Sequence, residues 1–247
     1  MLVIAVGAHA QDTCFDVDGS LCDSIVLNCD TLPSKPVTIY DAPYSRTLSM
    51  PDWRGLGYNT AALYGAGFVT LGVLELLPEG ATAWNKTQLH QTPLFERWWQ
   101  HVSNGPVWDH DNVVFDYVLH PYGGAAYFMS ARSRGFNMWQ SALYSAAVST
   151  IFWEYGIEAF MEYPSIQDLV ITPVVGSVIG ECFYMVKRSI IASDYRLCGS
   201  SVLGHTVAWL VDPVNEFVYL FAGNPTRNFI RANLTTAPHH LSLVVTF

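Results

Sequence analysis

The stretch IQDLVITPVVGSVIGECFYMV, residues 166–186, decides the class of fold. It is about as long as the ~20 apolar residues that a membrane-crossing helix needs. Thr172, Gly176 and Gly180 recur four residues apart, so they share one helix face and let a neighbouring backbone approach closely. Because buried helices of soluble proteins also use small residues in this way, the pattern predicts helix packing more firmly than it predicts a bilayer.

Four further apolar segments lie around this one. They are residues 58–77, 113–131, 138–161 and 202–211. The five segments predict an all-α fold, a bundle of about five apolar helices over residues 56–222 that is membrane-embedded or membrane-associated. Pro173 and the His120-Pro121 pair interrupt two of the segments, and the last segment is short. These interruptions favour a compact bundle at a membrane over helices that each span a bilayer cleanly.

The composition supports a membrane location. Hydrophobic residues make up 51% of the chain and charged residues 13%, whereas soluble domains carry about 25% charged residues. The net charge of −9 and the lack of a basic stripe exclude a nucleic-acid partner. There is no Walker loop and no G-x-G-x-x-G motif, so no nucleotide is expected. The expected partner is a membrane lipid or an envelope protein.

The ends of the chain differ from its middle. Residues 1–10 resemble a truncated signal peptide, with small residues flanking His9, although the usual basic start is missing. Residues 11–55 are predicted to be an irregular periplasmic segment. Residues 223–247 form a tail that ends in the β-prone LSLVVTF, as strands of outer-membrane barrels do. These features place the protein in the bacterial cell envelope, in the outer membrane or facing the periplasm.

Ionisable residues inside apolar helices are costly, so they mark candidate functional sites. Asp116 and His120 share a helix face, and so do Glu154 and Glu158. A carboxylate orients a neighbouring histidine and makes it more basic, which suits acid–base chemistry. Two facing carboxyl groups raise one another's pKa or bind a cation. The candidate catalytic residues are His120, Glu154, Glu158 and Asp168.

Other polar residues are candidates for ligand binding. They are Asp116, Arg132, Ser165 and Glu181. Arg132 can hold a phosphate, although arginines near the end of a span more often reach the interface. Ser165-x-x-Asp168 is typical of a helix N-cap, and we favour that role over a nucleophile because no G-x-S-x-G elbow is present.

Metal binding is an alternative interpretation. Di-iron bundles use Glu-x-x-His pairs and further glutamates, whereas the spacings here are Asp-x-x-x-His over 116–120 and Glu-x-x-x-Glu over 154–158. Only one histidine is well placed. The leading prediction therefore contains no metal ligand and no cofactor. A fully bonded polar network that locks the helices together has equal weight with any functional role.

The polar positions also carry a family resemblance. The pattern HPxxG…YxxxAR…WExxxE…PSxxDLxxTPxxGxxxGE runs from His120 to Glu181. It resembles a bacterial cell-envelope family catalogued as a domain of unknown function, over roughly residues 55–215, and is distantly similar to VanZ-like families. The resemblance implies a set of shared polar positions and no established reaction. Relatives with longer strand-rich C-terminal regions put the completeness of the chain in doubt.

Three functions remain open, and whether the protein is an enzyme is undecided. The first is a non-enzymatic membrane protein that binds a lipid or an envelope partner. The second is a lipid- or glycolipid-processing enzyme that uses the His/Glu/Asp residues, and the third is a metal-binding helical bundle. Convergence of these side chains on an open cavity, with polar atoms unsatisfied, would favour the enzyme. Complete pairing in a closed core would count against it.

Overall fold

The computed structural model describes residues 2–7, 37–78, 91–108, 114–226, 231–237 and 240–246. The chain divides into two compact units. Residues 38–224 form the larger unit, and residues 1–37 together with 225–247 form the smaller one.

The smaller unit contains a three-stranded sheet in the order β1-β3-β2. The strands are β1 (Leu2–Gly7), β2 (Arg231–Ala237) and β3 (His240–Thr246). β3 pairs in parallel with β1 and antiparallel with β2, so Leu243 lies opposite both Ile4 and Leu234. The expected C-terminal β segment corresponds to β2 and β3. β1 lies within residues 1–10, for which a signal peptide stays a prediction.

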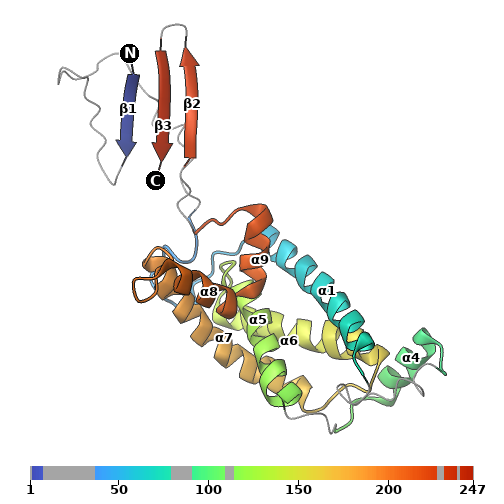
Figure 1. Cartoon of the computed structure of the whole chain (residues 1–247). Coiled ribbons are helices and arrows are strands. Elements are labelled where there is room, and N and C mark those ends of the chain that lie inside the picture. Colours follow the sequence, from blue (N-terminus) through green and yellow to red (C-terminus); the bar gives the residue numbers. More distant parts are fainter. Residues whose placement is uncertain are drawn as a thin grey trace. The chain divides into compact units, whose positions relative to one another are not determined.

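The described part of the larger unit contains helices and no strand (Figure 1). The α-helices are α1 (Trp53–Leu76), α4 (Leu94–Asn104), α5 (His120–Arg132), α6 (Met138–Ala147), α7 (Asp168–Ala192), α8 (Ser201–Val211) and α9 (Pro213–Ala222). The π-helical segments are η2 (Phe115–Leu119) and η3 (Val148–Ile157), and η4 (Glu158–Phe160) is a 3-10 helix. The predicted all-α class is confirmed for this unit.

The five predicted apolar segments correspond to α1, η2 with α5, α6 with η3 and η4, α7, and α8. The structure adds α4 and α9. The predicted segment 202–211 matches α8, which ends at Val211. A further helix, α9, begins at Pro213, because the N–H that proline lacks has no partner in a first helical turn. Pro173 lies in the second turn of α7, where it removes one backbone hydrogen bond, and the helix continues through it.

The backbones of α5 and α7 touch where the two helices cross (Figure 1). A Cβ atom added to Gly124 of α5 would lie 1.9 Å from the carbonyl oxygen of Thr172. One added to Gly176 of α7 would lie 2.6 Å from the Cα atom of Gly124. α6 joins them through Ser145, whose hydroxyl donates to the Gly124 carbonyl oxygen over 2.9 Å. The small residues on α7 thus allow the close helix approach that their spacing predicted.

Wide π-helical turns occur in two of the helices. η2 leads directly into α5, and η3 continues α6. Pro121 lies in the first turn of α5 and has no N–H to donate to the preceding turn, which favours a change of helix type there. The predicted break at His120-Pro121 is therefore a change of helix type and not an end. π-helical turns are rare and often lie at functional sites.

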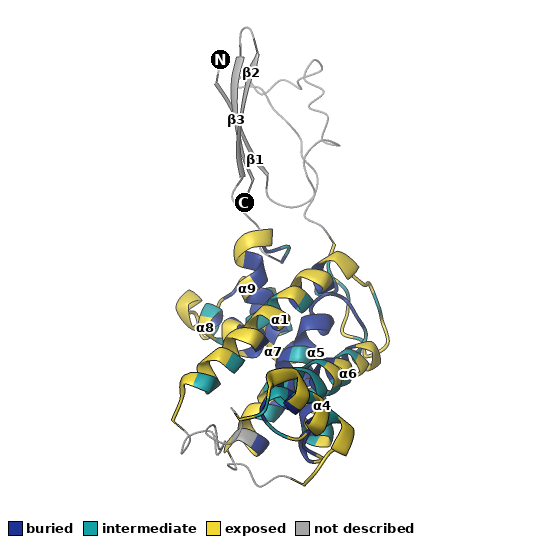
Figure 2. Ribbon diagram, turned by 90° about the vertical axis from the view of Figure 1, so that its right-hand side faces the viewer, coloured by how far each residue is buried: buried dark blue, intermediate teal, exposed yellow. Residues whose placement is uncertain are grey.

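The larger unit buries many polar side chains and exposes many apolar ones. Figure 2 shows which parts of each helix are buried and which are exposed. Buried polar and charged side chains outnumber buried apolar ones among the described residues. On α7 the ionisable Asp168, Glu181 and Lys187 are buried, whereas Val174 and Val178 are exposed, Val178 to 65%. Of the described helices, α7 alone has the length and hydropathy to cross a membrane, and 28% of its most apolar stretch is buried.

Buried ion pairs join α7 to α9. The Lys187 ammonium is fully buried and pairs with Asp212 at 3.2 Å and with Glu216. The Ser133 hydroxyl donates to Asp212 Oδ2 over 2.6 Å, and Asn215 Nδ2 donates to Asp212 Oδ1 over 2.8 Å. The Lys187 ammonium therefore offsets part of the cost of burying these two carboxyl groups.

Candidate functional site

His120 begins α5, and its ring faces the first turns of α7. Its Nδ1 lies 3.2 Å from Thr172 Oγ1 and 3.7 Å from Asp168 Oδ1. Glu154 of η3 approaches the same nitrogen, with Oε1 at 4.0 Å. The histidine side chain is 13% exposed, so the group is almost enclosed. We call His120, Glu154, Glu158 and Asp168 the polar cluster.

The two glutamates of the polar cluster lie one helical turn apart, Glu154 in η3 and Glu158 at the start of η4. A ring nitrogen of His120 and one carboxyl oxygen of each glutamate all lie within 4.8 Å of one another. Glu154 is 1% exposed. Among the described residues, no amide, hydroxyl or amine donor reaches Glu154 Oε1 or Glu158 Oε2, and both oxygens are buried. Each can still take a proton, a cation or a ligand.

Ser165 holds two members of the polar cluster in place. Its N–H donates to Glu154 Oε2 over 3.0 Å, and its hydroxyl accepts from the Asp168 N–H over 3.2 Å. The second contact is the Ser-x-x-Asp hydrogen bond that the N-cap prediction expected, although Gln167 occupies the N-cap position of α7 and makes no side-chain cap bond. A bridge between Val107 and Ser165 fixes the backbone here. One oxygen of Glu154 is thus anchored, while the other points toward His120.

Burial raises the pKa of both glutamates. The pKa of Glu154 rises to about 8, mainly because burial penalises the charged form; the Ser165 N–H opposes this rise and the Asp168 charge adds to it. Burial, followed by the charge of Glu154, raises the pKa of Glu158 well above its usual range. Two carboxyl groups so close do not both ionise at neutral pH in the absence of a cation. The pair therefore holds a proton.

Because the glutamate pair holds this proton, the stability of the folded protein should depend on pH. Because the folded pKa of Glu154 is about 8 and its ordinary value is 4.5, protonation favours the folded state. The stabilisation is fully present below about pH 4.5 and is lost as the pH rises through about 8. In a chelator, the Tm of the wild type should therefore fall more steeply with rising pH than the Tm of Glu154→Gln, which cannot ionise. Parallel Tm profiles would contradict this titration.

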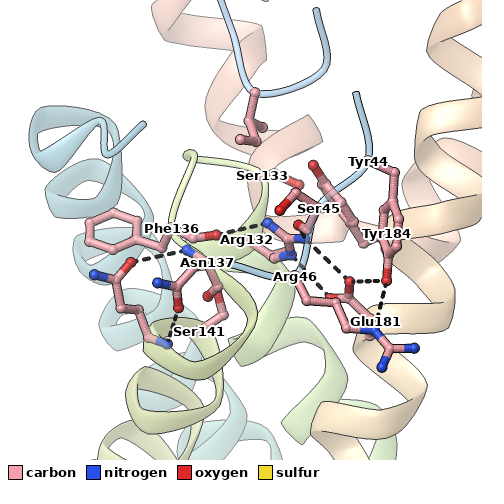
Figure 3. Close-up of polar contacts among 12 residues, drawn as sticks. Tyr44, Ser45, Arg46, Arg132, Ser133, Phe136, Asn137, Ser141, Glu181 and Tyr184 are labelled. Carbon is pink, nitrogen blue, oxygen red and sulfur yellow. Dashed lines mark hydrogen bonds and ion pairs between the residues drawn. The ribbon is translucent and has the colours of Figure 1, made fainter. Parts of the chain in front are cut away.

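Arg132 and Glu181, predicted to bind a ligand, bind each other (Figure 3). Arg132 Nε and Nη2 donate to the two carboxylate oxygens over 3.0 and 3.3 Å. The same guanidinium donates to the carbonyl oxygens of Phe136 and Ser45 over 3.0 and 2.7 Å, and lies 3.9 Å from the ring centroid of Tyr184. This pair fastens the segment around Ser45 to α5 and α7, so it is a structural pair away from the polar cluster.

The structure brings all four predicted catalytic residues together, although they lie on α5, η3, η4 and α7. Asp116 is buried on η2, about one turn before His120. Thr172 was missed as a site residue. Its position one turn after Asp168, on the inner face of α7, is the signal that could have identified it.

A cavity of about 630 Å³ lies elsewhere in the larger unit, between α1 and α4. Phe68, Glu75, Arg97 and Phe160 are among the residues that line it. No member of the polar cluster does. Two features were expected of an enzyme: unsatisfied polar atoms that converge, and an open cavity beside them. The polar cluster has the first feature, but it does not line this cavity.

The fold and the site define a class of protein, an all-helical domain around a buried His and carboxylate cluster. Residues 105–214 match the model of a family described as Domain of unknown function (DUF3943), and a DUF3943 domain therefore lies in this part of the chain. The polar cluster and Asp116, Arg132, Ser165 and Glu181 all lie inside the matched range. No curated protein and no solved structure matches the chain. The prediction of a domain of unknown function is thus confirmed over residues 105–214. The motif block, the cell-envelope assignment and the VanZ-like relation stay predictions.

Proposed function

We propose that residues 38–224 form a membrane-associated helical domain of the bacterial cell envelope, whose outer faces contact lipid acyl chains. The observation that carries this proposal is the reversed polarity of α7, with buried ionisable residues and an exposed row of valines. In water, a helix is more stable with its apolar side chains buried, because each Å² of apolar surface removed from water stabilises the fold by about 25 cal/mol. Lipid acyl chains are as apolar as these valines, so a helix in a membrane gains no such stability from burying them.

The dimensions of α7 fit this environment. Its 25 residues are about 37 Å long, which exceeds the ~30 Å of a bilayer hydrocarbon core. Val170, Val174 and Val178 follow one another every four residues on its exposed side. α1 also has an exposed apolar row, formed by Val69, Val73 and Leu76. These apolar faces support a lipid more than a polar protein partner.

Vesicle flotation tests the proposal. After detergent removal, the full chain should float with vesicles of phosphatidylethanolamine and phosphatidylglycerol. The binding should not weaken in high salt, because a chain of net charge −9 gains nothing from anionic headgroups. Val178→Asp places a charge among acyl chains, at a cost of about 2.5–3.5 kcal/mol, and should lower the bound fraction about tenfold or more.

Ser189→Asp is the matched control for this experiment. Ser189 is also exposed on α7 but lies near the end of the helix, where a charge can reach water. The Ser189→Asp variant should therefore bind vesicles as well as the wild type does. A wild-type chain that stays in the aqueous fraction would contradict the proposal, and so would equal binding by the two variants.

A second candidate function is processing of a lipid or glycolipid at the polar cluster. It is favoured by the position of His120 beside Glu154, whose pKa is raised, because such a pair can take up and release a proton near neutral pH. Comparison of envelope lipids from cells with the wild type and with a His120→Ala, Glu154→Gln double variant tests it. An unchanged lipid profile would count against the enzyme.

A further inference from the structure

The polar cluster combines one imidazole with carboxyl oxygens at distances that suit a metal ion. Bonds of about 2.1 Å hold tetrahedral ligand atoms about 3.4 Å apart and opposed octahedral ligand atoms about 4.2 Å apart. His120 Nδ1 lies 4.0 Å from Glu154 Oε1 and 3.7 Å from Asp168 Oδ1. An atom from each of His120, Glu154 and Glu158 lies within 4.8 Å of the others. Small side-chain rotations would therefore bring these atoms to bonding distance.

Within the part of the chain that the structure describes, no lysine or arginine side chain forms an ion pair with Glu154 or Glu158. Among the described residues, His120 is the one basic side chain within 4.0 Å of the Glu154 carboxylate. Lys187 and Arg132, which are buried elsewhere in the same unit, are already paired with Asp212 and Glu181. Glu154 is more than nine-tenths buried, and its Oε1 faces His120 without an amide, hydroxyl or amine donor. A bound cation would satisfy both this oxygen and Glu158 Oε2.

The surrounding contacts hold the donor atoms in place. The Ser165 N–H donates to the other oxygen of Glu154, and the bridge between Val107 and Ser165 holds that serine in place. Such contacts orient metal ligands and contribute to their affinity. His120 comes from α5, whereas Glu154 and Glu158 come from η3 and η4. The three donors therefore do not follow the Glu-x-x-His spacing of a metal pair on one helix, which is why the sequence indicated metal binding only as an alternative.

We propose that His120, Glu154 and Glu158 bind one divalent transition-metal ion, with Asp168 beside it. An imidazole with carboxylates suits Zn²⁺, Mn²⁺, Fe²⁺ or Co²⁺, whereas Mg²⁺ and Ca²⁺ prefer oxygen ligands alone. The site is independent of the proposed lipid contact, because its atoms lie in the interior and the exposed valines do not line it.

Titration of the chelator-treated full chain with Co²⁺ tests this site. We expect saturation at one ion per chain, with a visible spectrum that lacks the intense near-ultraviolet band of thiolate ligation, which separates this site from the cysteines. His120→Ala and Glu154→Gln should each weaken binding about tenfold or more. His205→Ala and Glu96→Gln change the same residue types outside the polar cluster and should bind Co²⁺ like the wild type.

Far-ultraviolet circular dichroism checks that each variant is folded, and Glu158→Gln replaces a variant that is not. A folded wild type that shows no saturable Co²⁺ uptake at millimolar concentration overturns the proposal. So does uptake that persists in His120→Ala and Glu154→Gln. Flotation of the same samples with vesicles reports separately on the lipid contact, so failure of one proposal is distinguishable from failure of the other.

Discussion

Replacement of Lys187 by Met will lower the free energy of unfolding by about 3–5 kcal/mol. The ammonium of Lys187 is fully buried and is paired with both Asp212 and Glu216. Methionine fills a similar volume, so the main loss is the cation, and two carboxyl groups remain in an interior that disfavours their charge. Urea unfolding followed by tryptophan fluorescence measures the change.

The triple variant Lys187→Met, Asp212→Asn, Glu216→Gln identifies the cause. It keeps the shapes of the side chains and removes the uncompensated charge, so it should be more stable than Lys187→Met alone. If the triple variant is as unstable as the single one, lost packing and not unpaired charge accounts for the effect.

Gly124→Ala will destabilise the larger unit by about 3 kcal/mol or more, at the upper end of overpacking effects. The new Cβ atom would lie 1.9 Å from the carbonyl oxygen of Thr172, which is backbone and cannot rotate away. α5 and α7 must therefore separate, and the separation moves His120 away from Thr172 and Asp168. Thermal unfolding should show a lower Tm, and Co²⁺ affinity should fall with it.

Gly123→Ala is the matched control on the same helix. The nearest atom to its added Cβ would be Tyr127 Oη at 3.8 Å, an ordinary contact. Because alanine in a helix is about 0.5–1 kcal/mol more favourable than glycine, this variant should be as stable as the wild type or more stable. Equal destabilisation by both substitutions would show that the α5–α7 contact is not the cause.

The helices could be predicted from the sequence because their apolar runs are long. The predicted segment 58–77 begins and ends within five residues of the ends of α1. The predicted segment 166–186 overlaps most of α7. The inward face of α7 could be predicted from Thr172, Gly176 and Gly180, which the structure buries against α5. The partners of Asp168, Glu181 and Lys187 could not be predicted, because they lie on other helices or far along the chain.

The polar cluster could be predicted only in part. The four-residue spacing of Glu154 and Glu158 placed them on one helix face, and the list of ionisable residues in apolar segments included His120 and Asp168. Their convergence depends on the crossing of α5 and α7, which contacts between distant residues determine. Likewise, Arg132 and Glu181 were both noted as candidates, but they are 49 positions apart in the sequence, so their pairing could not be predicted from spacing. The three- and four-residue spacings identify neighbours on one helix, but they do not identify residues that meet across two different helices.

The π-helical turns of η2 and η3 have a consequence for the comparison of relatives. An α-helix rotates about 100° with each residue, so one residue more or fewer in η3 would turn Glu154 away from Ser165 and His120. The amino acids of the cluster could all be conserved while the cluster itself is lost. A single-residue gap between Ser149 and Glu154 in an alignment is therefore as informative as a substitution of the glutamate.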